Sequence, residues 1–165
     1  MKYKLYCDGS TRGNGKENAI GGWAYVVVHE EGAIICQAAE SEVGTTNQRM
    51  ELTAALRGLK TIFPTLRIGD IVQVYTDSAY LHNCVTQRWY DNWQRNGWKN
   101  AKRQPVANAD LWEELIPYFD TWGVEFYKVK GHAGDKWNEY VDTLAQAAAE
   151  RRKVEEITAD GNCNN

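Results

Sequence analysis

The strongest constraint on the fold is a change in the spacing of apolar residues near residue 45. Before it lie three short runs of β-branched and aromatic residues, separated by glycine-rich breaks, at residues 3–8, 22–29 and 33–38. Such runs are typical of β-strands, and the hairpin-length loop between the second and third indicates antiparallel neighbours. After residue 45 the apolar period becomes about 3.6, which predicts a helix that Pro64 ends.

The apolar stripe of this helix is formed by Leu52, Leu56, Leu59 and Phe63. Thr45 and Gln48 resemble a capping box at its start. Further along the chain, residues 70–77 and 124–129 predict two more strands. Residues 78–103 carry helical stretches, a further helix is expected near residues 109–119, and an alanine-rich helix closes the chain.

This order of elements predicts an α/β fold, with helices packed on the faces of a mixed five-stranded sheet. The first three strands are antiparallel, and the last two arrive through helical crossovers, so each should run parallel to a neighbour. If the first and fourth strands are adjacent, Asp8 and Asp77 lie together at the carboxyl edge of the sheet. Open α/β sheets bind their ligands at that edge.

The composition is that of an ordinary globular domain, with 165 residues of which 43% are hydrophobic and 25% charged. We expect one domain over residues 1–153 and a polar, frayed tail at residues 154–165. No apolar run approaches the ~20 residues of a membrane span, and the start lacks a signal-peptide pattern, so we expect a cytoplasmic protein without a membrane partner. The four cysteines are widely spaced, which fits free thiols rather than a zinc site or a disulfide framework.

Four acidic residues occupy positions that the fold draws together. Asp8 and Asp77 each end a predicted strand, where a turn or a helix cap is the simplest alternative explanation. Glu51 lies on the shoulder of its helix's apolar stripe, and Asp142 lies on the shoulder of the stripe in the closing helix. Burying an unpaired carboxylate is costly, so two acids at the border of the core need a reason.

Carboxylates brought within a few ångströms repel one another, and a divalent cation reverses that repulsion. Ligands that are all Asp and Glu oxygens favour Mg²⁺ or Mn²⁺ over Zn²⁺. A pocket of four carboxylates has room for two ions, the arrangement that stabilises both the attacking and the leaving oxygen in phosphodiester cleavage. We therefore expect Asp8, Glu51, Asp77 and Asp142 to be metal ligands.

Five short motifs resemble those of type 1 ribonuclease H, in that family's order. They are "DGS" at 8–10, "TTNQRMEL" at 45–52, "YTDS" at 75–78, "KGHAG" at 130–134 and "NEYVD" at 138–142. The resemblance implies a ribonuclease H-like fold and a two-metal endonuclease that cuts the RNA strand of an RNA/DNA hybrid, leaving 5′-phosphate and 3′-hydroxyl ends. By similarity, Asp8 bridges two Mg²⁺ ions, Asp142 serves the ion that activates water, and Glu51 and Asp77 hold the other, with Mn²⁺ as a substitute.

His132 lies in a glycine-flanked loop ahead of the closing helix. A single histidine in a loop is usually a solvated side chain, although histidine is the commonest proton-transfer residue in enzymes. The resemblance gives His132 a catalytic role as an auxiliary group that assists proton transfer or product release.

Residues 88–103 carry five basic side chains against one acidic side chain, although the formal net charge of the whole chain is -3. This stretch also holds three tryptophans, and cations interleaved with flat rings suit nucleic acid bound without sequence readout. Alternatively, Trp89 and Trp93, spaced i,i+4, pack a helix against the core. The stretch resembles the basic handle with which some cellular family members grip the DNA strand. The candidate contacts are Trp89, Trp93, Arg95, Trp98, Lys99, Lys102 and Arg103.

Four further residues match family positions that contact the hybrid. Asn14, Asn47 and Gln48 match residues that reach its minor groove, where the 2′-hydroxyl distinguishes RNA from DNA, and Thr46 matches a residue beside a DNA phosphate. The first loop is longer than the family's usual turn and lacks its proline, which would displace Asn14, and Gln48 replaces a common asparagine. Asn14 as a turn residue and Asn47 as a helix cap are the alternatives.

Two other functions are compatible with four acids on such a sheet. A strand-transferring integrase core would normally need further DNA-binding domains, for which the length leaves no room. A non-catalytic hybrid-binding module would retain the acids only for structure. The leading prediction remains a monomeric hybrid endonuclease.

Overall fold

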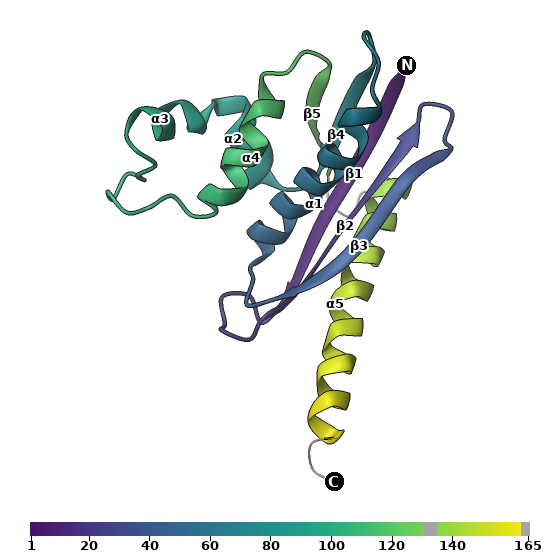
Figure 1. Ribbon diagram of the computed structural model, residues 1–165, viewed down its shortest axis with the longest axis vertical. Helices are drawn as coiled ribbons and strands as arrows, with labels where there is room; N and C mark the ends of the chain where they lie inside the picture. Colours follow the sequence, from purple (N-terminus) through teal and green to yellow (C-terminus); the bar gives the residue numbers. More distant parts are fainter. Residues whose placement is uncertain (131–134, 163–165) are drawn as a thin grey trace.

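The structure, a computed structural model, describes residues 1–130 and 135–162, with side chains up to residue 156. Its centre is a five-stranded sheet in the order β3-β2-β1-β4-β5 (Figure 1). The strands are β1 (Lys2–Arg12), β2 (Ile20–His29), β3 (Ile34–Val43), β4 (Ile71–Thr76) and β5 (Val124–Lys128). β1, β2 and β3 pair antiparallel, whereas β4 pairs parallel with both β1 and β5. The predicted mixed sheet is confirmed.

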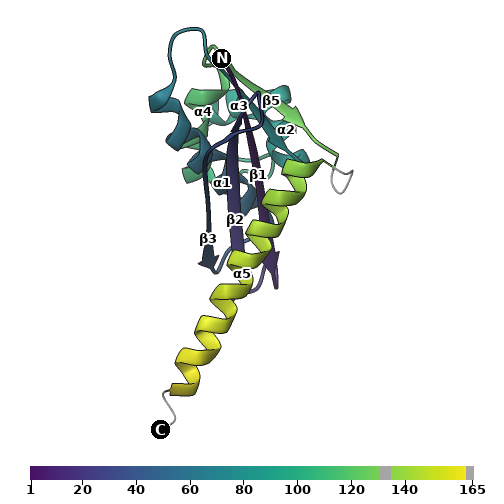
Figure 2. The ribbon, with the colours of Figure 1, turned by 90° about the vertical axis from the view of Figure 1, so that its right-hand side faces the viewer.

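Helices cover the two faces of the sheet unequally. They are α1 (Asn47–Ile62), α2 (Ala79–Gln87), α3 (Trp89–Arg95), α4 (Ala109–Phe119) and α5 (Lys136–Asn162), with a short 3₁₀ turn, η1 (Phe63–Thr65), after α1. The first four share a large core with one face, whereas α5 alone packs across the other face on Tyr6, Ala24 and Val26 (Figure 2). Two helices on opposite faces can therefore both reach the carboxyl edge.

β1 is longer than the sequence predicted, because it continues past Asp8 to Arg12. The antiparallel pairing with β2 extends along this whole length, from Tyr3 opposite His29 to Arg12 opposite Ile20. The parallel pairing with β4, however, stops at Cys7 opposite Thr76. Asp8 therefore does not end a strand in a turn; it lies where one neighbouring strand stops and the other continues.

α1 begins one residue later than the capping box predicted. Its N-cap is Thr46, whose Oγ1 accepts a hydrogen bond from the Arg49 backbone N–H at 3.1 Å, while Thr45 is buried. At the other end, Phe63 falls in the 3₁₀ turn and is 36% exposed, so Ile62 completes the apolar stripe in its place. The α-helix thus ends just before the 3₁₀ turn that contains Pro64.

α5 also differs from its predicted length, because it continues through the expected tail to Asn162. No proline interrupts residues 154–162, and Arg152 Nε lies 3.1 Å from Glu156 Oε1, an i,i+4 ion pair that supports a helix. The helix extends well past the sheet (Figure 1). Within the described residues, no helix is both long and apolar enough to cross a membrane.

Candidate active site

The four predicted acids come together in one pocket, from four different elements. Its volume is about 440 Å³, and we call it the carboxylate pocket. It is lined by Asp8, Gly9, Ser10, Thr11, Asn47, Glu51, Asp77 and Asp142. Carboxylate oxygens of Asp8, Glu51 and Asp77 lie within 4.8 Å of one another. Asp142 is in contact with Asp8 and accepts hydrogen bonds from Gln146 Nε2 at 3.1 Å on each oxygen.

The sheet brings Asp8 and Asp77 together because β1 and β4 are parallel neighbours. Each acid follows the last paired residues of the two strands, Cys7 and Thr76. The Gly9 backbone N–H donates to Asp8 Oδ1 at 2.9 Å, which orients that carboxylate. Asp8 is 4% exposed, so it forms the floor of the pocket.

Glycines allow both helices to approach the sheet closely enough to deliver their acids. A Cβ atom on Gly9 would lie 2.5 Å from both the Glu51 backbone nitrogen and the Met50 carbonyl carbon. On the other face, a Cβ on Gly22 would collide with the Ala145 carbonyl oxygen of α5. These obstacles are backbone atoms, which cannot swing aside. Gly9 therefore places α1 with Glu51, and Gly22 places α5 with Asp142.

The carboxylates strongly perturb one another. Burial, reinforced by the charge of Asp77 and by contact with Asp142, raises the pKa of Asp8 to about 9. Burial also raises the pKa of Glu51 to about 7, although a hydrogen bond with the Ser78 hydroxyl opposes that shift. Without a cation, the pocket thus favours protonated acids at positions where ionised ones would repel.

The donor set fits a hard divalent cation. Carboxylate oxygens are the ligands that Mg²⁺ and Mn²⁺ prefer, and the positive charge of an ion would offset the repulsion among Asp8, Glu51 and Asp77. The nearby thiol of Cys7 is fully buried, and burial together with the charge of Asp8 raises its pKa, so it stays protonated. Its Sγ instead donates to the Tyr75 carbonyl oxygen at 3.6 Å, which leaves oxygen ligands alone.

The predicted minor-groove residues gather at the N-terminus of α1, beside this pocket. Asn14 Oδ1 accepts a hydrogen bond from the Asn47 backbone N–H at 2.9 Å, so the longer first loop still brings Asn14 to the helix. Asn47 lines the carboxylate pocket, and Gln48 is exposed in the first turn. Thr46 uses its hydroxyl as the N-cap, which corrects the alternative that Asn47 caps the helix.

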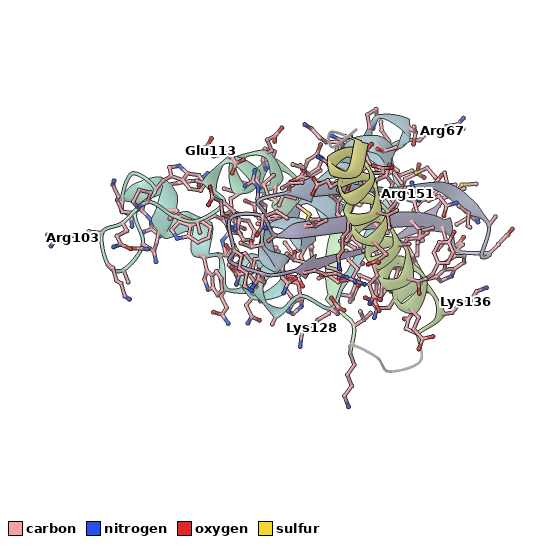
Figure 3. The ribbon with its side chains drawn as sticks, turned by 90° about the horizontal axis from the view of Figure 1, so that it is seen from below. Arg67, Arg103, Glu113, Lys128, Lys136 and Arg151 are labelled. Atoms are coloured by element: carbon pink, nitrogen blue, oxygen red, sulfur yellow. The ribbon has the colours of Figure 1, made fainter. Side chains whose placement is uncertain are left out.

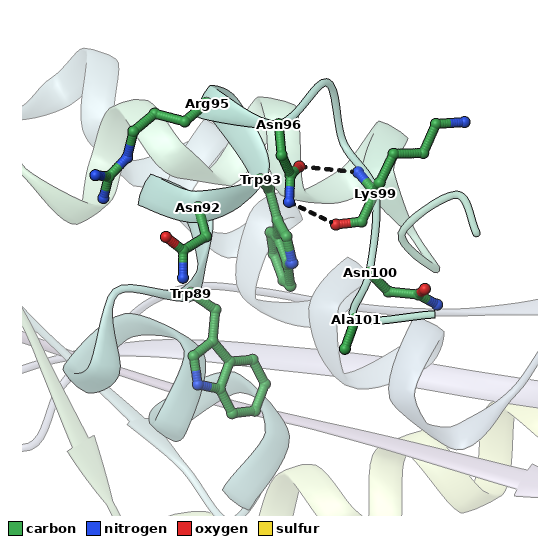
Figure 4. Close-up of a pocket in the computed structure, with 8 residues that line it drawn as sticks. All are labelled: Trp89, Asn92, Trp93, Arg95, Asn96, Lys99, Asn100 and Ala101. Atoms are coloured by element: carbon green, nitrogen blue, oxygen red, sulfur yellow. Dashed lines mark hydrogen bonds between the residues drawn. The ribbon is translucent and has the colours of Figure 1, made fainter. Parts of the chain in front are cut away.

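The handle, residues 88–103, contains α3 and the loop after it. A second pocket of about 440 Å³ opens here, lined by Trp89, Asn92, Trp93, Arg95, Asn96, Lys99, Asn100 and Ala101 (Figure 4). The side chain of Asn96 fixes the backbone of Lys99, because it accepts from the Lys99 N–H and donates to the Lys99 carbonyl oxygen, both at 3.0 Å. The loop is therefore held in shape by its own asparagines.

The tryptophans of the handle pack against the core, as the alternative interpretation of the sequence predicted, and two of them also line the handle pocket. Trp89, Trp93 and Trp98 are half-buried and pack against the core, with the ring of Trp93 5.6 Å from that of Trp112. Trp89 and Trp93 also line the handle pocket. The ring centroids of Trp93 and Trp98 are 5.9 Å apart. The backbone of Trp98 has a left-handed φ of 63°.

The cations of the handle are not equivalent. Arg88 is engaged by two acids, Asp91 and Asp120, each at 2.8 Å. The other four basic side chains are exposed and form no ion pair within the described part of the chain: they are Arg95, Lys99, Lys102 and Arg103. Arg103 projects at the outer end of the handle, far from α5 (Figure 3). The handle thus has free positive charge at its tip.

Other residues that line the two pockets or contact their acids were not predicted from the sequence. Gly9 and Ser78 lie inside the motifs at 8–10 and 75–78, but nothing in those motifs singles them out as the contacts of α1 and of Glu51. Gln146 lies four residues after Asp142, and that i,i+4 spacing was the available signal. The asparagines of the handle pocket, at positions 92, 96 and 100, share the same spacing within the basic stretch. His132 lies outside the described residues.

Comparisons with known proteins agree on one family. The family model for RNase H matches residues 1–150. Curated proteins named ribonuclease H include one from Syntrophomonas wolfei, 46% identical over 87% of this chain and 93% of its own, and one from Clostridium botulinum, 39% identical over 93% and 99%. Among solved structures, LC9-RNase H1, described as a type 1 RNase H with the type 2 active-site motif, is 32% identical with a TM-score of 0.72, covering 90% of this chain and 72% of that one.

A second solved structure, LC11-RNase H1 in complex with an RNA/DNA hybrid, is 18% identical, with a TM-score of 0.66 over 91% of this chain and 98% of that one. At this identity the likeness supports the fold alone. The sequence matches and the fold together show that the chain belongs to the RNase H family. Within that family it is a type 1 ribonuclease H, as the motifs predicted.

Proposed function

We propose that this chain hydrolyses the RNA strand of RNA/DNA hybrids in the carboxylate pocket, using two Mg²⁺ ions and leaving 5′-phosphate and 3′-hydroxyl ends. One observation carries the proposal: carboxylates from β1, α1 and the end of β4 lie within 4.8 Å of one another. Membership of the RNase H family, whose curated relatives are named ribonuclease H, supports the reaction. The same membership, together with the five motifs that resemble type 1 ribonuclease H, supports the substrate.

Each acid has a proposed role that follows from its place. Asp8 would contribute its carboxylate to both ions, because it is central, buried and in contact with acids on both sides. Asp142 and Asp8 would hold the ion that activates water, and Glu51 and Asp77 would hold the other. When bound, such ions generate the nucleophile and stabilise charge on the leaving oxygen. The chain itself supplies orientation, through the Gly9 N–H on Asp8 and the Ser78 hydroxyl on Glu51.

His132 is proposed as an auxiliary group for proton transfer or product release, on the family resemblance alone. Histidine in general suits such a step, because its side chain can both accept and donate a proton near neutral pH. We expect its replacement to slow turnover less than replacement of Asp77, because loss of a metal ligand removes the ion as well.

Substrate binding is proposed at two surfaces. At the N-terminus of α1, the amides of Asn14, Asn47 and Gln48 would contact the minor groove and its 2′-hydroxyls, with Thr46 beside a DNA phosphate. In the handle, the exposed cations would neutralise phosphates while the half-buried tryptophans present flat surfaces to the sugar-phosphate backbone. The candidates there are Trp89, Trp93, Arg95, Trp98, Lys99, Lys102 and Arg103.

We also propose that the enzyme works as a cytoplasmic monomer over residues 1–153. All four carboxylates come from one chain, so no second subunit is needed to complete the pocket. The described cysteines, Cys7, Cys36 and Cys84, are free thiols, which suits a reducing compartment. Mn²⁺ has the same preference for oxygen ligands and is expected to substitute for Mg²⁺.

The test compares cleavage of end-labelled RNA in a hybrid, in duplex RNA and in single strands, with duplex DNA as a further substrate. We expect internal cuts only in the hybrid and only with Mg²⁺ or Mn²⁺. Glu51→Gln should abolish cutting while the far-UV circular dichroism stays unchanged. Glu113→Gln, an exposed acid of α4, is the matched control and should cut normally. Undiminished cleavage by Glu51→Gln would exclude the metal assignment.

A further inference from the structure

Among the residues that the structure describes, no helix packs over one part of the sheet. On the face that α5 occupies, this helix packs on β1, β2 and β3, while β5 is an edge strand that pairs only with β4. α5 therefore crosses the sheet on the side of β1, β2 and β3 and leaves β4 and β5 beside it (Figure 2). The side chains that β4 and β5 present on this face are the ones of interest. They include Gln73, Tyr75, Glu125 and Tyr127.

Three tyrosines cross this face in a row from the core to the open edge. Tyr6, Tyr75 and Tyr127 are aligned in register on β1, β4 and β5, and we call them the tyrosine row. Ring centroids are 4.8 Å apart for the first pair and 5.3 Å for the second, with interplanar angles of 12° and 21°. Tyr6 is buried, whereas Tyr127 is 40% exposed. Because Tyr75 covers its inner side, the outer side of Tyr127 is the open end of the stack.

The outer ring is held in place, which is unusual for an exposed tyrosine on an edge strand. Its hydroxyl donates to Glu125 Oε2 at 2.7 Å, and Gln73 Nε2 donates to the same oxygen at 3.2 Å. The hydrogen bond to Glu125 raises the pKa of the Tyr127 phenol, so the ring is neutral at physiological pH. A fixed, uncharged ring loses little conformational entropy when a second ring stacks on it.

The tyrosine row runs directly beside the carboxylate pocket. Because side chains alternate along a strand, Asp8 and Asp77 project on the same face as Tyr6 and Tyr75, two residues earlier. Tyr127 is opposite Tyr75, and Asp77 lies two residues beyond Tyr75 along the chain. The Cα atoms of Tyr127 and Asp77 are therefore about 8 Å apart, from the rise along a strand and the spacing between strands. That separation is close to the step from one nucleotide to the next in a single strand.

We propose that the outer face of Tyr127 stacks on an unpaired base of the RNA strand that leads away from the cleavage site. The inference rests on the proposed function, because the strand held by the acids must be RNA. A base in a duplex is already stacked on its neighbours, so only an unpaired nucleotide gains from the open ring. The enzyme would accordingly favour hybrids that carry a single-stranded RNA extension over blunt hybrids of equal length.

The experiment measures binding by fluorescence anisotropy in EDTA, where cleavage does not interfere. The probes are one RNA/DNA hybrid with blunt ends and the same hybrid with four unpaired nucleotides on the 5′ or the 3′ end of the RNA. For the wild-type chain, we expect one extension to tighten binding about five- to tenfold, the gain from stacking one base on an aromatic ring. Tyr127→Ala should reduce that gain to less than twofold and leave the blunt hybrid unaffected, whereas Tyr127→Phe should retain most of it.

Trp122→Ala provides the matched control, because Trp122 is an aromatic residue 78% exposed just before β5, away from the acids. It should bind every probe like the wild type. Equal wild-type affinity for blunt and extended hybrids would overturn the inference, as would an equal loss on both probes with Tyr127→Ala, which would mark the tyrosine row as a structural brace. Cleavage of the blunt hybrid with Mg²⁺ is scored separately, so failure of the proposed function is distinguished from failure of this inference.

Discussion

Replacing the central acid should make the metal-free protein more stable while removing its activity. Asp8 is buried, and its pKa is raised from 3.8 to about 9 by burial and by the neighbouring acids. In the unfolded chain the same carboxyl titrates near 3.8, so at pH 7 folding must take up a proton. One pKa unit corresponds to about 1.4 kcal/mol, so the interval from 3.8 to 7 corresponds to a cost of about 4 kcal/mol.

Asp8→Asn removes this cost because an amide has no charge to bury. The amide oxygen can still accept the hydrogen bond from Gly9, although the bond is weaker than one to a carboxylate, so we expect a net gain of about 2–3 kcal/mol in the free energy of unfolding at pH 7. The sign follows from the direction of the shift. A raised pKa leaves the wild type unpenalised below pH 3.8 and increasingly penalised as pH rises toward 9, so the advantage of the variant should grow across that window.

The assay is urea denaturation in EDTA at pH 4 and pH 7, followed by circular dichroism. Asp110→Asn is a control of opposite sign, because hydrogen bonds from Arg49 lower the pKa of Asp110. That variant should lose stability at pH 7, and the loss should shrink as pH falls. The reasoning is refuted if Asp8→Asn is less stable than the wild type at pH 7, or if its gain is the same at both pH values.

Further predictions concern metal, helix placement and the handle. Gly9→Ala pushes α1 away from β1 and should weaken Mg²⁺ binding about tenfold in a calorimetric titration. Gly32→Ala is the control: its left-handed φ of 93° should make the variant less stable, but the hairpin has open space around it and is not part of the pocket, so the Mg²⁺ affinity of the folded protein should not change. Mg²⁺ should raise the Tm of the wild type through binding to the folded state, and EDTA should reverse this; no shift would contradict a metal site. In a plot of the logarithm of the hybrid-binding constant against the logarithm of the salt concentration, Lys102→Ala and Arg103→Ala should each reduce the slope by about 1, while the cleavage position stays the same. Unchanged slopes would exclude phosphate contacts at these residues.

The sheet was predictable because its signals are local and mutually consistent. Alternating apolar runs gave the strands, the change in period gave α1, and the helical crossover before residue 70 required β4 to run parallel to a neighbour. From that arrangement, the meeting of Asp8 with Asp77 followed. The positions of Glu51 and Asp142 on the shoulders of their apolar stripes also followed from the helical period alone. The two acids meet because both helices present that shoulder at the same edge of the sheet.

What the sequence could not give depends on contacts between distant segments. The length of β1 beyond Asp8 is set by β2, which keeps pairing after β4 stops. The importance of Gly9 is invisible until α1 rests on it, since an Asp-Gly pair also predicts a turn. Likewise, the pairing of Arg88 with Asp120 joins residues 32 positions apart, so counting charges in the handle overstated its free positive charge.

The origin of the four acids in four separate elements has a consequence for the life of the protein. Asp8 comes from the first strand, and Asp142 arrives only with the last helix, which must settle on Gly22 before the pocket closes. A chain still emerging from the ribosome, or one that has lost α5 by partial unfolding, lacks part of the ion-binding set. Nuclease activity therefore reports on completed folding, because a copy without a seated α5 lacks one of the four carboxylates of the pocket.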